Sequence, residues 1–216
     1  MAQVEVEDIG IRERQKRETR QKILQAALEL FAEKGFEGAS VRDIASRAGV
    51  IHGLIKYHFD GKDQLWKAAV DFLFERQDEE LKAPPGYDDL SPDAQARDWI
   101  RRYVHYCARH PEHARIMVQE SIRDSKRLRW AVERHISPLH DLARRIGNSR
   151  VRQRVYPDIP PHAIIYIISA AAQSPFMLSA EVALAEGKNV SDPAEIDAYA
   201  DALITFLLDH KSTPPE

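Results

Sequence analysis

Residues 40–62, SVRDIASRAGVIHGLIKYHFDGK, contain two short helical patterns separated by a glycine, with two histidines, one tyrosine and two lysines in the second pattern and the turn after it. Ser40 stands where an N-cap would begin the first helix, and Asp43 three positions later comes close to a capping box. Gly49 ends this helix, and a second helix is expected over about 51–59. Such a cluster of polar side chains could form a catalytic pocket, a metal site or a surface that contacts an anion.

Two short helices joined by a tight glycine turn form the helix-turn-helix arrangement. In this interpretation residues 41–48 are the supporting helix and residues 51–59 are the helix that reads DNA. Gly49 permits the turn, and Gly53 lets a ligand approach the backbone of the reading helix closely. The apolar residues predicted to close a small core are Ile23, Ala27, Phe31, Ile44, Ala45, Ala48, Val50, Ile55 and Phe59.

Helical patterns also fill the rest of the chain. Residues 20–34 carry apolar side chains on one face, and Gly35 is expected to end this helix. Pro138 and Pro175 fall inside two later helices and predict kinks there. Further helices are expected over about 62–81, 93–109, 111–123, 125–147, 161–187 and 193–210. Because no segment alternates polar and apolar residues as a strand would, we predict an all-α chain of about nine helices.

The composition is that of a soluble globular protein. The 216 residues are 44% hydrophobic and 30% charged, which fits one medium domain or two small ones. Cys107 is the only cysteine, so no internal disulfide can form. The polar N-terminal stretch lacks the apolar centre of a signal peptide, and the most apolar run, 163–178, is shorter than the roughly 18–20 residues that span a bilayer. We therefore expect a cytoplasmic protein.

Charge is distributed unevenly along the chain, although the net charge is only −3. Residues 12–67 carry 12 Lys and Arg against 8 Asp and Glu, while the segments on either side are acidic. A basic segment beside an acidic remainder indicates that one end of the protein meets an anion. This favours nucleic-acid binding for the segment that contains the helix-turn-helix pattern.

The stretch TRQKILQAALELFAEKGFEGASVRDIASRAGV, residues 19–50, resembles the N-terminal domain of the TetR family of bacterial transcription regulators. Gly53, the Tyr-His-Phe run at 57–59, Lys62 and Leu65 extend the resemblance. It implies an N-terminal three-helix DNA-binding domain, predicted at 12–67, and a helical ligand-binding and dimerisation domain, predicted at 68–212. It also implies a homodimer, without enzyme activity or a cofactor, that is released from a palindromic operator by a small-molecule inducer. Repression is more usual than activation in this family.

The resemblance assigns roles to individual residues. Those whose family counterparts contact phosphates are Ser40, Arg42, Tyr57, His58 and Lys62. Those at positions that face the major groove, or that could pack on thymine methyl groups, are Ile51, His52, Gly53, Leu54 and Lys56. A basic arm near the DNA backbone or minor groove would consist of Arg12, Arg14, Lys16, Arg17 and Arg20.

This chain departs from the family pattern in the reading helix. Family members usually open that helix with Ser or Thr followed by Lys, Arg or Pro, whereas this chain has Ile51 and His52. Leu54 and Lys56 also stand where Thr, Ala or Ser and then Tyr are more common. These differences suggest an operator of unusual sequence. Other interpretations of single residues stay open: Tyr57 could be a core residue, His58 a local hydrogen-bonding group, and the basic arm a solvated helix or a disordered tail.

The second domain is expected to enclose an inducer and to form the dimer. The candidate pocket residues are Trp99, Tyr103, Tyr106, Met117, Gln119, Glu120, Trp130, Tyr166, Ser169, Gln173 and Phe176. Residues 109–122 and 160–187 resemble the subfamily that contains the regulator of pyrimidine utilisation. Gln173 matches its ligand-binding Gln, but Ser169 replaces its Trp, so the inducer stays open. The family pairs its last two helices with those of the partner subunit, and the small and apolar residues of 161–187 and 193–210 fit that arrangement.

Other classes of site receive less support. His110 and His113 have a spacing that metal ligands can use, but His-Pro-Glu-His is better explained as a helix start with Pro111 at the first position. No two-histidine metal motif, paired cysteine motif or nucleophile elbow occurs, so no metal and no catalytic residues are predicted. The rival hypotheses are a helical ligand-binding protein or enzyme with a helix-turn-helix that no longer reads DNA, and an architectural protein that binds DNA without sequence preference.

Overall fold

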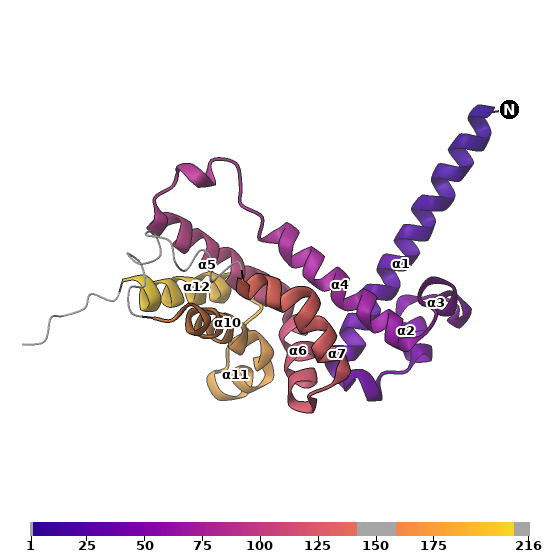
Figure 1. Ribbon diagram of the computed structural model, residues 1–216. Coiled ribbons are helices and arrows are strands. Elements are labelled where there is room, and N and C mark those ends of the chain that lie inside the picture. The colour runs from indigo at the N-terminus through magenta and orange to yellow at the C-terminus, as the bar shows by residue number, and fades with distance from the viewer. Residues whose placement is uncertain (1, 142–158, 210–216) are drawn as a thin grey trace, which may run out of the picture. The chain divides into compact units, whose positions relative to one another are not determined.

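The computed structural model describes residues 2–141 and 159–209 (Figure 1). Within these ranges the chain is all-α, with ten α-helices and no strand, which confirms the predicted fold class. The helices are α1 Ala2–Gly38, α2 Val41–Ala48, α3 His52–Phe59, α4 Lys62–Glu80, α5 Pro92–Arg109, α6 Pro111–Arg123, α7 Lys126–Ala131, α10 Pro161–Met177, α11 Ser179–Glu186 and α12 Pro193–Leu208. A 3₁₀ turn, η1, covers Tyr87–Asp89, and a π-helical turn, η2, covers Val132–Ile136.

The chain forms two compact units. Unit 1 consists of Met1–Glu75 and Arg115–Arg127, and unit 2 consists of Arg76–Ala114 and Leu128–Glu216. Helices α4, α6 and α7 therefore each contribute residues to both units. The sequence suggested a boundary between residues 67 and 68 that separates a DNA-binding domain from a ligand-binding and dimerisation domain. That boundary is defined by function and stays a prediction.

The core of unit 1 is the one expected from the sequence. Seven of the nine predicted core residues are buried, and Ala48 and Val50 at the turn are half-buried. The helix predicted over 20–34 is longer than expected, because α1 begins at Ala2 and continues to Gly38. Gly35 does not end it but bends it, with a non-helical φ of 70° and ψ of 172°.

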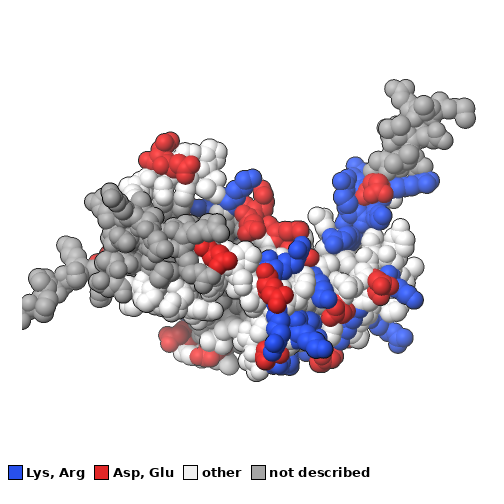
Figure 2. All heavy atoms as spheres, in the orientation of Figure 1, with Lys and Arg blue, Asp and Glu red and all other residues white. Residues whose placement is uncertain are grey.

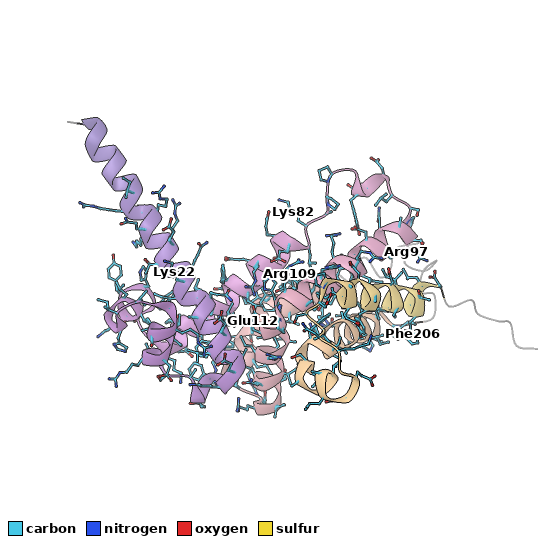
Figure 3. All side chains as sticks on the ribbon, turned by 180° about the vertical axis from the view of Figure 1, so that it is seen from behind. Lys22, Lys82, Arg97, Arg109, Glu112 and Phe206 are labelled. Atoms are coloured by element: carbon cyan, nitrogen blue, oxygen red, sulfur yellow. The ribbon has the colours of Figure 1, made fainter. Side chains whose placement is uncertain are left out.

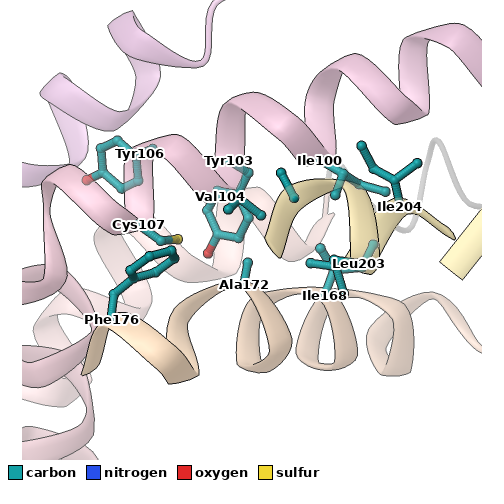
Figure 4. Close-up of a cluster of buried hydrophobic side chains, with 11 residues drawn as sticks. Ile100, Tyr103, Val104, Tyr106, Cys107, Ile168, Ala172, Phe176, Leu203 and Ile204 are labelled. Carbon is teal, nitrogen blue, oxygen red and sulfur yellow. The ribbon is translucent and has the colours of Figure 1, made fainter. Parts of the chain in front are cut away.

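The core of unit 2 is formed by α5, α10 and α12 (Figure 4). The buried residues of this cluster are Ile100, Tyr103, Val104, Tyr106, Cys107, Ile168, Ala172, Phe176, Ala200, Leu203 and Ile204. Ion pairs join α5 to α12 at the surface: Arg97 contacts Asp209, Arg101 contacts Asp201, and His105 lies 2.9 Å from Asp197. The apolar packing between α5 and α12 is therefore accompanied by a row of basic side chains on α5 that faces aspartates on and directly after α12.

The predicted kink at Pro175 takes a different form. Pro175 lies within α10, and the bend of 67° comes after it, where α10 ends at Met177 and α11 begins at Ser179. Proline has no N–H, so it cannot donate to the carbonyl of Ala171 four residues earlier. The Tyr199 hydroxyl of α12 donates to that carbonyl over 2.6 Å instead. A side chain from a neighbouring helix thus replaces the missing helical hydrogen bond.

The helix predicted over 125–147 is partly outside the described residues. Its described part consists of α7, the wider π-helical turn η2, and a further helical stretch over residues 137–141 that includes Pro138. Residues 142–158 lie beyond what the structure describes. Among the described helices no single one is long and apolar enough to cross a membrane, although the bent pair His162–Met177 and Ser179–Glu186 meets that test by length and composition alone.

Two glycines with positive φ give a test of the fold of unit 1. A Cβ at Gly35 would lie 2.8 Å from Oε1 of Gln119. The residue also has a backbone conformation that only glycine adopts readily, so Gly35→Ala should lower the free energy of unfolding by about 3 kcal/mol. Gly49 has φ 66° and open space where a Cβ would stand, so Gly49→Ala should cost only about 1 kcal/mol. Urea unfolding measures both values. Equal losses would contradict the close approach of α6 to Gly35.

Candidate nucleic-acid interface

The turn between α2 and α3 follows the sequence signals. The Ser40 hydroxyl accepts a hydrogen bond of 3.0 Å from the backbone N–H of Asp43 and caps α2. Gly49 adopts the left-handed conformation, with φ 66°, and donates its N–H back to the end of α2. Helix α3 then begins after Ile51, whose side chain makes no capping hydrogen bond. The departure from the usual Ser or Thr therefore leaves the first turn of α3 without a side-chain cap.

Helix α3 buries one face and exposes the other. Ile55 and Phe59 are buried in the core of unit 1, as expected. On the opposite side Ile51 is 74% exposed and Tyr57 is 68% exposed, and His52, Gly53 and Lys56 are exposed as well. Ile51, which caps α3, and Tyr57 on α3 thus place two large side chains on the water-facing side of this helix.

Gly53 and Leu54 add detail to this surface. A Cβ at Gly53 would meet no atom within 4 Å, so packing inside this chain does not require a glycine there. Because glycine has no side chain, an approaching molecule can come close to the backbone of α3 at this position. Leu54 is half-buried and reaches the edge of the surface only in part.

Cationic groups surround the exposed face of α3. Arg42 on α2 is exposed, and the Ser40 hydroxyl can still donate its own proton to an outside acceptor. Lys62, at the start of α4, is half-buried; its Nζ donates to the carbonyl of Glu37 over 3.4 Å and lies 4.4 Å from the centre of the Phe36 ring. Other cations of unit 1 are neutralised by acids: Arg47 contacts Glu33 at 2.6 Å and Lys34 contacts Asp43 at 3.5 Å.

The basic arm, residues 12–20, is helical and lies within α1. Lys and Arg side chains cluster on the part of α1 that follows the grey N-terminal residues (Figure 2). Lys16 lies 5.9 Å from the ring centre of Tyr57, and Arg20 lies 5.4 Å from that of Phe59. The arm is thus a solvated helix whose basic residues stand beside α3. The structure thus agrees with a solvated helix and not with a disordered tail, whereas the contact of this arm with DNA stays a prediction.

An open surface hollow of about 490 Å³ lies between α1, α3 and α4. Its lining residues are Arg20, Lys56, Tyr57, His58, Phe59, Asp60, Gln64 and Ala68. The pKa of His58 is lowered by partial burial and by the nearby charges of Lys16 and Arg20. Gln64 was not among the sequence candidates; it joins the hollow because α4 passes next to α3, a proximity that spacing alone does not reveal.

Five of the predicted pocket residues meet in unit 2. The rings of Trp99, Tyr103 and Tyr106 stack along α5, with centres 5.1 Å and 6.4 Å apart. Gln173 on α10 donates from Nε2 to the Tyr103 hydroxyl over 2.8 Å, and Phe176 is buried in the same cluster. Ser169 is half-buried on α10. Within the described part of unit 2 the crevice beside Gln173, lined by Tyr106, Cys107, His110, Pro111, His113 and Ala114, is too narrow to admit water.

The other predicted pocket residues lie elsewhere. Met117, Gln119 and Glu120 belong to unit 1, because α6 contributes its second half to that unit. Buried Glu120 accepts hydrogen bonds from Ser125 and Arg127, and Gln119 donates to the carbonyl of Ala32. In unit 2 Trp130 packs edge-on against His135, and Tyr166 is 63% exposed on α10.

The His-Pro-Glu-His sequence begins α6, as predicted, with Pro111 at its first position. Glu112 accepts a hydrogen bond of 2.6 Å from Arg76, and His113 Nδ1 lies 2.9 Å from the hydroxyl of Tyr106. Burial lowers the pKa of His113 to about 3, and the nearby charge of Arg76 adds to this effect. The pKa of Glu112 is also lowered: burial would raise it, but hydrogen bonding from His110 and the charge of Arg76 outweigh that effect.

Comparison with known proteins agrees with this geometry. The family model of bacterial regulatory proteins, tetR family, matches residues 23–69. An HTH-type transcriptional repressor of Mycobacterium tuberculosis is 57% identical over 51 residues, 24% of this chain, and the match spans only 27% of that relative's length. The "Probable HTH-type transcriptional regulator YttP" of Bacillus subtilis is 30% identical over 153 residues, which cover 70% of this chain and 74% of that protein.

Solved structures share the fold. The structure of AibR in complex with isovaleryl coenzyme A and operator DNA has a TM-score of 0.67 and 16% identity, and the match covers 88% of this chain and 98% of AibR. At this identity the likeness concerns the fold alone.

The buried histidine of unit 2 predicts a pH-dependent stability. In the unfolded chain His113 binds a proton near pH 6.5, whereas in the folded protein it does so only near pH 3. Stability from neutral His113 is therefore complete above about pH 6.5 and is lost as the pH falls toward 3, by up to about 1.4 kcal/mol per pH unit. Urea unfolding between pH 7 and 4 should show a shallower loss for His113→Gln than for the unchanged protein. His52→Gln, which removes an exposed histidine, is the control; identical slopes for the His113→Gln variant and the unchanged protein would refute the assignment.

Proposed function

Because the chain belongs to the tetR family of bacterial regulatory proteins, we propose that it is a sequence-specific DNA-binding transcriptional regulator. The observation that carries this proposal is the exposed face of α3, where large apolar and polar side chains face water while the other face is buried. The cations of α1, α2 and α4 that surround this face supply the charge that a DNA backbone requires. Such a protein would act in the cytoplasm and need no cofactor.

The proposed contacts divide into two classes. Lys56 and His52 would hydrogen-bond to base edges in the major groove, and Ile51 would pack against a thymine methyl group. Gly53 would let the backbone of α3 approach the bases. The residues proposed to contact phosphates are Ser40, Arg42, Tyr57, His58 and Lys62, with Arg20 from α1. Leu54, being half-buried, would contribute only the edge of an apolar contact.

We also propose that a small molecule binds unit 2 and releases the protein from DNA. In support, Trp99, Tyr103 and Tyr106 form an aromatic stack beside the amide of Gln173, a mixture typical of ligand sites. The crevice beside Gln173 is too narrow to admit water, so binding of the inducer would have to open it. The inducer would bind more tightly to the conformation that does not fit DNA and would shift the population toward it. Repression fits this scheme, as in the relative named a repressor.

The proposed protein is a homodimer that pairs through the last two helices predicted from the sequence, 161–187 and 193–210, which correspond to α10 with α11 and to α12. Phe206 on α12 is 68% exposed and projects from that helix (Figure 3). Tyr166 and Ile167 on α10 are exposed too. Large apolar side chains on two neighbouring helices are better covered by a second copy than left in water, and a two-fold dimer would match a palindromic operator.

The rival proposal is a helical ligand-binding protein or enzyme whose helix-turn-helix no longer reads DNA. The missing side-chain cap at Ile51 is the observation in its favour. Salt dependence separates the two, because phosphate contacts release counterions and make DNA affinity fall steeply with salt.

Fluorescence anisotropy with DNA flanking the gene tests the proposed contacts. Lys56→Ala should weaken binding about tenfold and relax specificity at one base pair of each half-site, because it removes a base contact. Arg42→Ala should weaken binding to all sequences and reduce the salt slope by about one, because it removes a phosphate contact.

The matched control is Lys82→Ala, which removes an exposed lysine of unit 2 from the loop after α4 (Figure 3). It should leave affinity within about twofold. If all three variants bind DNA equally well, α3 does not read DNA and the rival proposal gains.

Sedimentation velocity tests the dimer. Phe206→Glu places a charge in the proposed interface and should convert the dimer to monomers at micromolar concentration, since a buried unpaired charge is costly. Ile122→Glu, at an 80% exposed apolar position in unit 1, is the control and should remain dimeric. A dimeric Phe206→Glu variant would place the interface elsewhere.

A further inference from the structure

Arg127 and Phe36 are not among the residues assigned to DNA binding, yet they build the support of one that is. Phe36 follows the bend at Gly35, and its ring stacks on that of Phe31 with centres 5.8 Å apart. Two cations approach this ring: the Lys62 Nζ lies 4.4 Å from its centre and the Arg127 guanidinium carbon lies 3.6 Å from it. One phenyl ring thus receives a cation from the start of α4 and another from α7.

Lys62 needs this support because its place on α4 is unfavourable. It occupies the first position of α4, where the helix dipole disfavours a positive charge. The Phe36 ring and the carbonyl of Glu37, near the negative end of α1, offset that cost. They also direct the ammonium group, so the position of the Phe36 ring sets where Lys62 can meet a phosphate.

Arg127 is itself held firmly. Its side chain is largely buried, its Nε lies 3.3 Å from the carboxylate of Glu120, and its Nη2 lies 3.7 Å from that of Glu37. Glu120 is buried and also accepts a hydrogen bond from Ser125. Because two carboxylates already fix the guanidinium group, it loses little conformational freedom when it holds the Phe36 ring in place.

We propose that Arg127 and Phe36 are positioning residues for DNA binding, with Arg127 holding the Phe36 ring on which the Lys62 ammonium group rests. This inference relies on the proposed DNA-binding function and adds two residues to it that touch no DNA themselves. Because Glu120 on the second half of α6 anchors Arg127, a displacement of that half of α6 would withdraw this support from Lys62.

A double-mutant cycle tests the inference. The full-length protein is titrated by anisotropy onto a labelled duplex that carries the site enriched from randomised DNA. Lys62→Ala should weaken binding about tenfold, and Arg127→Gln about threefold to tenfold. In the Lys62→Ala background, Arg127→Gln should change affinity less than about twofold, because both changes remove the same phosphate contact. Each single variant should also lower the salt slope by about one.

Three further variants complete the test. Lys126→Gln removes the neighbouring exposed lysine with the same change of charge and should leave affinity within about twofold. Arg127→Lys keeps a cation over the ring and should bind nearly as well as the unchanged protein. Phe36→Leu keeps apolar bulk but removes the aromatic face, so it should weaken DNA binding about as much as Arg127→Gln. It therefore provides the same test if Arg127→Gln folds poorly.

Each outcome decides the question. Additive losses for Lys62→Ala and Arg127→Gln, or equal losses for Lys126→Gln and Arg127→Gln, would overturn the positioning role while leaving the DNA-binding function intact. A Lys62→Ala variant with unchanged affinity would overturn it as well. Failure of the unchanged protein to bind any enriched site would overturn the proposed function together with this inference.

Discussion

The packing of α3 against the core of unit 1 is the constraint on which the candidate site depends. Ile55 and Phe59 are buried among the apolar residues of α1 and α2, which fixes the rotation of α3 about its own axis. With that face committed, Ile51, Lys56 and Tyr57 must point to water. Gly49 makes the arrangement possible, because its left-handed conformation ends α2 and turns the chain at the start of the three-residue link to α3.

Charge pairing in unit 1 favours the same surface. Arg47 and Lys34 are neutralised by acidic residues of α1 and α2, so they contribute little field at α3. Among the described residues Arg42 and Lys56 take part in no ion pair, and they are exposed. The modest excess of positive charge in residues 12–67 is thereby concentrated where an anion can approach, although the whole chain carries a net charge of −3.

The local features of the fold could be predicted from the sequence because they depend on local chemistry. Ser40 caps α2, Gly49 turns the chain and Pro111 begins α6, as the residue types require. The bend at Gly35 could not be distinguished from a helix end, because contacts from Gln119 and Arg123, far along the chain, accompany it. The break at Leu178 is likewise accompanied by a contact from far along the chain, since Tyr199 donates to the carbonyl that Pro175 leaves without its helical donor.

The candidate sites could be predicted less evenly. The exposed residues of α3 follow from a helical pattern with one apolar face. Lys62 was expected only as a phosphate contact, and its packing on Phe36 and the Glu37 carbonyl could not be read from the sequence. Met117 and Glu120 have side chains suited to a pocket, but α6 is divided between two compact units, and both residues lie in unit 1. A division of that kind arises from tertiary packing and leaves no mark in the spacing of residues.

Selection of binding sites from a pool of randomised duplex DNA tests most directly the central claim, that the two α3 helices of a symmetric dimer read base sequence. The account predicts enrichment of a two-fold symmetric site whose half-sites are centred about one helical turn, roughly 10 base pairs, or a multiple of it apart. Recovery of DNA without any enriched sequence, or with a single asymmetric motif, would contradict it.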